Sequence, residues 1–301
     1  MNHDRHRLAF VAEERSFHLT ALALDAALAG SPRVKRVMFV GMSLQDDSLR
    51  EARDIAARHE AHLEDHSVDG PPVAAGSTPL ALSTLVHLLS RAERVDRLLY
   101  LCPGAIVTGD LSPLLSLDLR DKVIAGARDP EKVKLGYDFV HGKNSWNDVE
   151  GVAGLVTPWP IQSYIDTGVL LIDCAAIRRD AALLKKIHNL AAAGALGHDN
   201  QDRINLLFKG RILHVNPAWN APWGHPASRR SWARRCGYRG EETAFRAARI
   251  VRFGTTSGPP DMPSLLAPMH KQMERMAYKM AIRSFRLRHP DPGFLSSLRL
   301  T

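Results

Sequence analysis

The side chains that could do chemistry in this sequence stand where short apolar runs end. One run, Leu98–Leu101, has no helical period and is followed by Pro103 and Gly104, so it predicts a buried strand ending in a turn. In an open α/β sheet, ligands bind at the carboxyl ends of the strands. The side chain at this end is Cys102, whose soft thiol would prefer zinc or copper to magnesium. We favour the alternative that Cys102 is a small buried apolar residue.

Two polar triplets also border apolar or helical segments. Asp166-Thr167-Gly168 precedes the apolar run 169–172, and Asn200-Gln201-Asp202 opens a segment of helical character. The carboxylate of the first triplet can accept hydrogen bonds but offers no amide donor. Each triplet has a structural alternative: the first could belong to a plain buried strand, and the second could be a helix start capped by His198 or Asp199.

Strands and helices alternate along most of the chain and would position these groups. We expect strands over 8–12, 34–40, 98–101, 123–129 and 164–173, and helices over 19–28, 48–59, 80–91 and 175–193. Glycines and a proline follow the first and the last of these helices, as is typical of helix ends. The alternation predicts an α/β fold with a mostly parallel central sheet flanked by helices.

Several segments in order resemble glycosyltransferase family 8, whose members are retaining, nucleotide-sugar-dependent enzymes of the GT-A fold. Residues 98–114 resemble the central segment of the family, and Tyr164–Asp173 resembles its Phe-Asn-Ser/Ala-Gly-Val-Leu-Leu-Ile-Asn strand. Asn200–Asp202 is similar to the family's Asp-Gln-Asp, and Asn216–Asn220 to its Pro-x-x-Trp/Phe-Asn. The resemblance covers about residues 7 to 260 and implies a GT-A domain like those of the lipopolysaccharide galactosyl- and glucosyltransferases.

The resemblance implies a set of donor-binding positions. Ala12, Glu13 and Phe17 match the end of the family's first strand, which holds the base and ribose of the donor. A carboxylate can accept two hydrogen bonds from these groups, although this stretch could equally be a solvated loop. Thr167 and Gly168 match the small residue and the glycine of the sugar pocket, where the glycine allows close backbone approach.

The resemblance also implies catalytic positions. Gln201 matches the residue on the β-face of the donor sugar, where a nucleophile or a dipole that stabilises a cation is expected. Asp166 stands where the family has an Asn in the sugar pocket. Asp202 and Asn205 are expected in structural or acceptor-side roles, and Asp129, which ends the strand at 123–129, near the acceptor.

The residues that bind a metal in the family are absent. Its Asp-x-Asp positions hold Cys102-Pro103-Gly104, Arg252 replaces the metal-binding His, and the pyrophosphate-binding Lys that follows is missing. Magnesium and manganese prefer hard oxygen ligands, so we expect no divalent metal and no other cofactor. Two hypotheses remain. Either Arg252, together with Arg128, neutralises the diphosphate directly, or the fold has lost catalysis and serves as a binding or regulatory subunit.

Length and composition fit one large domain with an appendage. The chain has 301 residues, of which 45% are hydrophobic, enough for a sizeable core. We place the GT-A domain at 1–260 and a basic helical tail at 261–301. The sequence contains no run of 18 apolar residues, so we expect no membrane-spanning helix. Its three cysteines lack metal-site spacing and fit a reducing compartment. We therefore expect a cytoplasmic protein.

Positive charge is concentrated near the C-terminal end. Residues 229–301 hold 15 Lys and Arg against 5 Asp and Glu, whereas the whole chain holds 40 against 32. Over 269–288 the cations recur every three or four residues and the methionines fall mainly on another face, which is typical of an amphipathic helix on anionic lipid. A helix packed on the domain with a solvated basic face is equally compatible. The arginines and aromatics of 223–239 could bind single-stranded nucleic acid. We rank this function last because no recognisable nucleic-acid-binding fold accompanies these residues.

These observations lead to one expected function. We expect transfer of a hexose from a nucleotide sugar, in the first place a UDP-hexose, to a cell-surface glycan or glycolipid precursor. The expected mechanism is a metal-independent variant of the retaining reaction, at the inner face of the cytoplasmic membrane.

Overall fold

The structure is a computed structural model of the chain. It describes residues 5–68, 81–143, 163–192, 200–222 and 248–252, together with residues 234, 235 and 283. The segment 144–162, most of the arginine and aromatic stretch 223–239, and the tail 261–301 apart from residue 283 lie outside the described residues. The predictions that fall on those segments therefore stay predictions.

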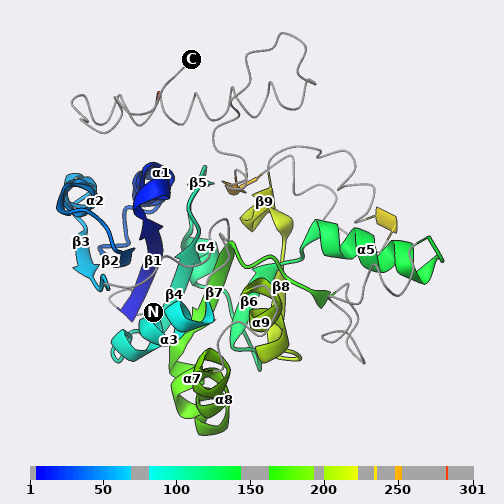
Figure 1. The fold of residues 1–301 in the computed structure, drawn as a ribbon. Coiled ribbons are helices and arrows are strands. Elements are labelled where there is room, and N and C mark those ends of the chain that lie inside the picture. The colour runs from blue at the N-terminus through cyan, green and yellow to red at the C-terminus, as the bar shows by residue number, and fades with distance from the viewer. Residues whose placement is uncertain are drawn as a thin grey trace.

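A seven-stranded sheet forms the centre of the described fold (Figure 1), with the strand order β3-β2-β1-β4-β7-β6-β8. Its strands are β1 (His6–Glu13), β2 (Arg36–Met42), β3 (His62–Asp65), β4 (Arg97–Leu101), β6 (Ile124–Ala127), β7 (Val169–Asp173) and β8 (Ile212–Val215). The pairs that β7 forms with β4 and β6 are antiparallel, and the other four pairs are parallel. The predicted mostly parallel sheet is confirmed.

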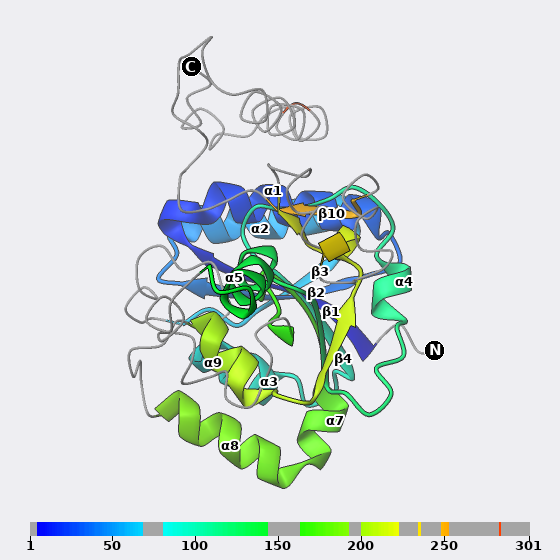
Figure 2. The ribbon, with the colours of Figure 1, turned by 90° about the vertical axis from the view of Figure 1, so that its right-hand side faces the viewer.

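Helices cover both faces of this sheet (Figure 2). One face carries α1 (Phe17–Gly30) and α2 (Asp46–Arg58), and the other carries α3 (Leu82–Arg91), α7 (Cys174–Arg179), α8 (Ala181–Ala192) and α9 (Asn200–Leu207). The helix α5 (Pro130–Val140) follows the carboxyl end of β6 and extends past β8 (Figure 1). Because both faces are covered, strands such as β1 and β4 read as continuous apolar runs. Within the described part of the chain, no helix is long and apolar enough to cross a bilayer.

Most of the expected elements are confirmed, with ends shifted by no more than two residues, but two expectations are wrong. The single helix expected over 175–193 is broken at Asp180, whose carboxylate accepts the N–H of Leu183 at 2.9 Å and pairs with Arg211. A short side chain that caps the backbone competes with helix continuation. The strand expected from 164 begins only at Val169, because 166–168 turn before it; Ile165 forms an isolated bridge.

A second, three-stranded sheet brings distant segments to the carboxyl end of β4. Its order is β5 (Ala105–Val107), β10 (Ile250–Arg252) and β9 (Ala221–Pro222). Arg252 pairs with Ala105 in the antiparallel β5 and with Pro222 in the parallel β9. Arg252 is therefore placed directly beside the turn that contains Cys102, Pro103 and Gly104.

Candidate active site

The candidate site lies at the sheet edge where β4 and β6 end and β7 begins. Because β7 runs opposite to both neighbours, the turn that precedes it meets their carboxyl ends. The N–H of Cys102 donates to the carbonyl of Gly168 at 2.9 Å, and the N–H of Asp129 donates to the carbonyl of Tyr164 at 3.0 Å. Backbone pairing thus brings together three segments that the sequence analysis had singled out separately.

Gln201, in the first turn of α9, is held on both sides of its amide. Its Nε2 donates to Oδ2 of Asp129 at 2.7 Å, and its Oε1 accepts the N–H of Thr167 at 3.0 Å and the hydroxyl of Thr167 at 3.3 Å. These partners fix the orientation of the amide. Because two donors already engage the carbonyl oxygen, the geometry favours an oriented dipole over a nucleophile.

Asp129 connects this amide to α5. Its Oδ1 accepts the N–H of Glu131 at 2.9 Å and that of Lys132 at 3.2 Å, so it caps the helix. Burial, and next the negative charge of Asp166, raise the pKa of Asp129; the hydrogen bonds from α5 and Gln201 offset part of this effect. The structure therefore gives Asp129 a positioning role toward Gln201 that the sequence did not indicate.

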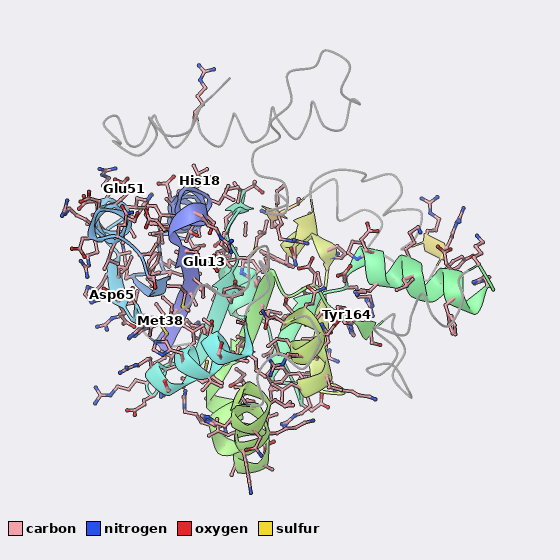
Figure 3. All side chains as sticks on the ribbon, viewed as in Figure 1. Glu13, His18, Met38, Glu51, Asp65 and Tyr164 are labelled. Atoms are coloured by element: carbon pink, nitrogen blue, oxygen red, sulfur yellow. The ribbon has the colours of Figure 1, made fainter. Side chains whose placement is uncertain are left out.

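Two further residues of α9 fasten the segment before β7. Asn205 is fully buried; its Oδ1 accepts the N–H of Ile165 at 2.8 Å, and its Nδ2 donates to the carbonyls of Ile165 and Gln201, both at 2.9 Å. Asp202 accepts a hydrogen bond from the hydroxyl of Tyr164, which Figure 3 shows beside α9. Burial, and next this bond to Asp202, raise the pKa of Tyr164, so the phenol stays protonated. Asp202 and Asn205 thus position the segment that precedes β7 by hydrogen bonds to Tyr164 and Ile165.

The three positions that match the family's metal ligands also come together, with different chemistry. Cys102 is fully buried, and burial raises the pKa of its thiol to about 12, so it stays protonated. Gly104, at a φ of 79°, contributes no side-chain ligand. A thiol, a glycine and the guanidinium of Arg252 supply no hard oxygen, so these residues do not fit magnesium or manganese. Among the described residues, no group of three or more His, Cys, Asp or Glu could hold a metal ion.

Arg252 is engaged by two partners. Its Nη2 forms an ion pair with Oδ2 of Asp166, and its Nε donates to Oδ1 of Asn220 at 3.3 Å. Burial alone would lower the pKa of Arg252, but the negative charge of the neighbouring Asp166 outweighs it, so the pKa is raised and the cation is permanent. The side chain remains 20% exposed, so the guanidinium is partly accessible.

Two residues, Gly168 and Asn220, lie against the side chain of Arg252 and fix its position. A Cβ on Gly168 would lie 2.7 Å from Cδ of Arg252 and 3.1 Å from Oδ1 of Asp166, so the close approach expected at this glycine is made by Arg252. Asn220 is 2% exposed, and its Nδ2 has no hydrogen-bond partner among the residues that the structure describes. A buried polar group left unsatisfied costs about 1–3 kcal/mol. Nothing in the sequence marks the pairing of Asn220 with Arg252, which lies 32 positions further on.

The positions expected to hold the base and ribose lie at the junction of β1 and α1, where Figure 3 shows Glu13 well apart from Tyr164. Ala12 and Phe17 are buried, and both belong to the apolar core. The carboxylate of Glu13 pairs with Arg15 at 2.6 Å, whereas Glu14 accepts two hydrogen bonds from the start of α2. This stretch is therefore an ordered corner, and the donor contact at Glu13 would compete with Arg15.

Arg128, the second cation considered for the diphosphate, directly follows β6. Its backbone forms a bridge with Ile165. The pKa of His214 is lowered by burial first and next by the positive charge of Arg128. Arg128 is therefore close to His214 of β8, and its contact with a phosphate stays a prediction.

The sheet order and the site at its carboxyl edge define the class: the described fold is a GT-A fold, and solved glycosyltransferases share it. The structure matches that of the galactosyltransferase LgtC in complex with donor and acceptor sugar analogs with a TM-score of 0.62 and 16% identity, over 91% of this chain and 95% of that one. It matches the bifunctional glycosyltransferase WbbM with a TM-score of 0.63 and 12% identity, over 82% of this chain and 45% of that one.

A third solved structure, the glycosyltransferase GlyE of Streptococcus pneumoniae TIGR4, matches with a TM-score of 0.59 and 16% identity, over 93% of this chain and 62% of that one. The chain thus spans less than two thirds of WbbM and of GlyE. No protein with a curated description matches the chain in sequence. The model of glycosyl transferase family 8 matches residues 73–230, more than half of the chain. The chain belongs to this family of glycosyltransferases, as the resemblance implied.

Proposed function

We propose that the protein transfers a hexose from a nucleotide sugar, in the first place a UDP-hexose, to a cell-surface glycan or a lipid-linked acceptor, with retention and without a divalent metal. The observation that carries this proposal is the position of Arg252. Its mostly buried cation lies beside the hydrogen-bonded group of Asp166, Thr167 and Gln201, which is proposed to contact the sugar. Arg252 stands where the family pattern has a metal ligand, and Asp166, Thr167 and Gln201 are linked around it.

The proposed chemistry divides between the two sides of the site. The bond between the sugar C1 and the diphosphate oxygen breaks while the acceptor hydroxyl oxygen forms its bond to C1 on the same face, and the hydroxyl proton passes to the departing phosphate. Negative charge develops on that phosphate, and the guanidinium of Arg252 can neutralise it through paired hydrogen bonds. The oriented amide dipole of Gln201 stabilises the positive charge that develops on the sugar ring. Asp166 and Gly168 line the sugar pocket, and Asp129 holds Gln201 and faces the acceptor. Ala12, Glu13 and Phe17 keep their proposed place toward the base and ribose.

The test is release of nucleoside diphosphate from a panel of nucleotide sugars, with and without glycan acceptors, in EDTA or in manganese. We expect one donor to be consumed at equal rates in both conditions. Consumption that requires manganese would contradict the metal-independent mechanism while leaving the transferase function in place.

A second candidate function is a binding or regulatory subunit without turnover. It is favoured by the engagement of Arg252 with Asp166 and of the Gln201 carbonyl with Thr167, since both groups are already satisfied within the protein. A nucleotide sugar that binds but is never consumed, with any acceptor, would select this candidate.

We also propose that residues 269–288 attach the protein to anionic membrane lipid, which would place it on the inner face of the cytoplasmic membrane. The positive charge of the tail supports this, and Arg283, its one described residue, is helical and exposed. The full chain should sediment with phosphatidylglycerol vesicles at low salt, and a chain ending at Pro268 should not. Equal partitioning of the two would contradict the attachment.

A further inference from the structure

We infer that Asn220 and Arg252 together form an anion site for the diphosphate of the donor, and that Asp166 competes with this anion for Arg252. The inference rests on the proposed function. It adds Asn220 as a second hydrogen-bond donor to the diphosphate and Asp166 as the group that competes with the diphosphate for Arg252. The competing role of Asp166 does not follow from the family motifs, because Asp166 and Arg252 both depart from them. Asn220 matches the last residue of the Pro-x-x-Trp/Phe-Asn motif, and the resemblance implied no role for it toward the diphosphate.

The first support is the unpaired amide of Asn220. The side chain is 2% exposed, its Oδ1 accepts from Nε of Arg252, and its Nδ2 makes no hydrogen bond within the described part of the chain. Buried polar groups in native proteins are nearly always paired, and an exception points to a missing ion, water or ligand. The neighbouring guanidinium carries a permanent positive charge, so an acceptor with negative charge would suit both groups once Asp166 no longer occupies Arg252.

The second support is the way in which Arg252 is held. Asp166 takes Nη2 and Asn220 takes Nε, and among the described residues no hydrogen bond to Nη1 is found. The side chain is 20% exposed. An incoming phosphate oxygen can therefore bind Nη1, and it gains Nη2 as well if Asp166 withdraws. In the inferred site the amide of Asn220, which is buried in this structure, turns toward the same anion. Asp166 would keep one partner, because its Oδ1 accepts the N–H of Gly168 at 2.8 Å.

The third support is the location in the small sheet. Arg252 pairs with Ala105, immediately after the turn 102–104, and Asn220 directly precedes β9. These are the positions around which the family pattern gathers its metal ligands, so the leaving diphosphate of the donor would meet them. A nucleoside diphosphate is thus the ligand class that fits both the charge and the place.

The experiment is calorimetric titration of the full chain with UDP in EDTA, with inorganic pyrophosphate as a competitor. N220D keeps an acceptor for Nε of Arg252 but removes the amide donor and adds a negative charge, so we expect UDP to bind about tenfold or more weakly. D166N removes the competing charge and places an amide against the guanidinium, so we expect UDP to bind several-fold more tightly. R249A, which changes an exposed arginine three residues away, should leave the affinity unchanged.

Unchanged UDP affinity in N220D and D166N would overturn the inference, as would a loss in N220D that affects UDP but leaves competition by pyrophosphate intact.

Thermal unfolding provides a second readout. N220D should melt at or above the wild-type temperature because Nδ2 has no partner, whereas N205D should melt lower because both bonds of its Nδ2 are lost. Equal losses in the two would show that Asn220 is already paired. If UDP affinity follows the expected order but no nucleotide sugar is consumed, the proposed transfer fails and the anion site stands.

Discussion

The two sides of the candidate site differ in how completely the protein satisfies its own polar groups. On the side of Gln201, the side chains of Asp129, Gln201 and Asn205 are joined to the backbone and to one another by hydrogen bonds of 2.7 to 3.2 Å. On the side of Arg252, a thiol and a glycine stand where the resemblance implies carboxylates, and Nδ2 of Asn220 is a buried donor without a partner among the described residues. The side of Gln201 is complete within the described residues, whereas the side of Arg252 keeps a donor that the proposed anion would engage.

This difference indicates what each side contributes. A fully connected, buried network keeps its dipoles in place without reorganisation during the reaction. A permanent cation with a spare donor provides charge where a metal would otherwise supply it. The comparison therefore predicts that variants on the side of Arg252 lose donor binding and turnover, and that variants on the side of Gln201 lose stability first.

The largest effect is expected for R252A. It removes the cation proposed to neutralise the leaving diphosphate, so turnover should fall about 10²- to 10³-fold, the usual consequence of losing one group that stabilises transition-state charge. The rate of donor consumption measures it, with R249A as the matched control in the same segment. Unchanged turnover in R252A would show that the cation does not replace the metal.

The next effect is expected for N205A on the side of Gln201. It leaves the N–H and carbonyl of Ile165 without their buried partners, so the free energy of unfolding should fall by about 1–3 kcal/mol or more. Urea denaturation measures it. N189A, at an exposed position of α8, should stay within about 0.5 kcal/mol of wild type. A fall in UDP affinity without a loss of stability in N205A would reverse the assignment of the two sides.

A smaller effect is expected for G168A, which links the two sides. The added methyl would approach Cδ of Arg252 to 2.7 Å, so the arginine must shift. Displacement of a charged group by about 1 Å can cost tenfold to about 100-fold in rate, while the melting temperature should change little. Full activity in this variant would indicate that the position of Arg252 is not critical.

The smallest effect is a pH dependence of stability. Burial and the charge of Asp166 raise the pKa of Asp129 above its ordinary value of 3.8. A carboxyl whose pKa is raised by folding stabilises the protein below that ordinary value, and the contribution is lost as the pH rises through the folded-state pKa. Stability measured by urea denaturation from pH 3.8 upward should therefore decline less steeply in D129N than in wild type. Equal slopes would show that another group dominates.

The sequence predicted the central sheet because its strands are buried on both faces and read as uniform apolar runs, as in Leu98–Leu101. It missed the break at Asp180, because one side-chain cap decides it. The resemblance places Cys102 and Gly104 at the family's metal-ligand positions, and the loss of the metal stays a prediction. The ion pair between Asp166 and Arg252 was not visible in the sequence, because 86 positions separate the partners and the pairing of the short strand β10 brings them together.

The most direct test of the account is calorimetric titration of the wild-type protein with UDP and UDP-hexoses, in EDTA and again in manganese. We expect binding of equal affinity in both conditions, because Arg252 and Asn220 are proposed to supply the groups that hold the diphosphate. Binding that appears only when manganese is added would contradict it.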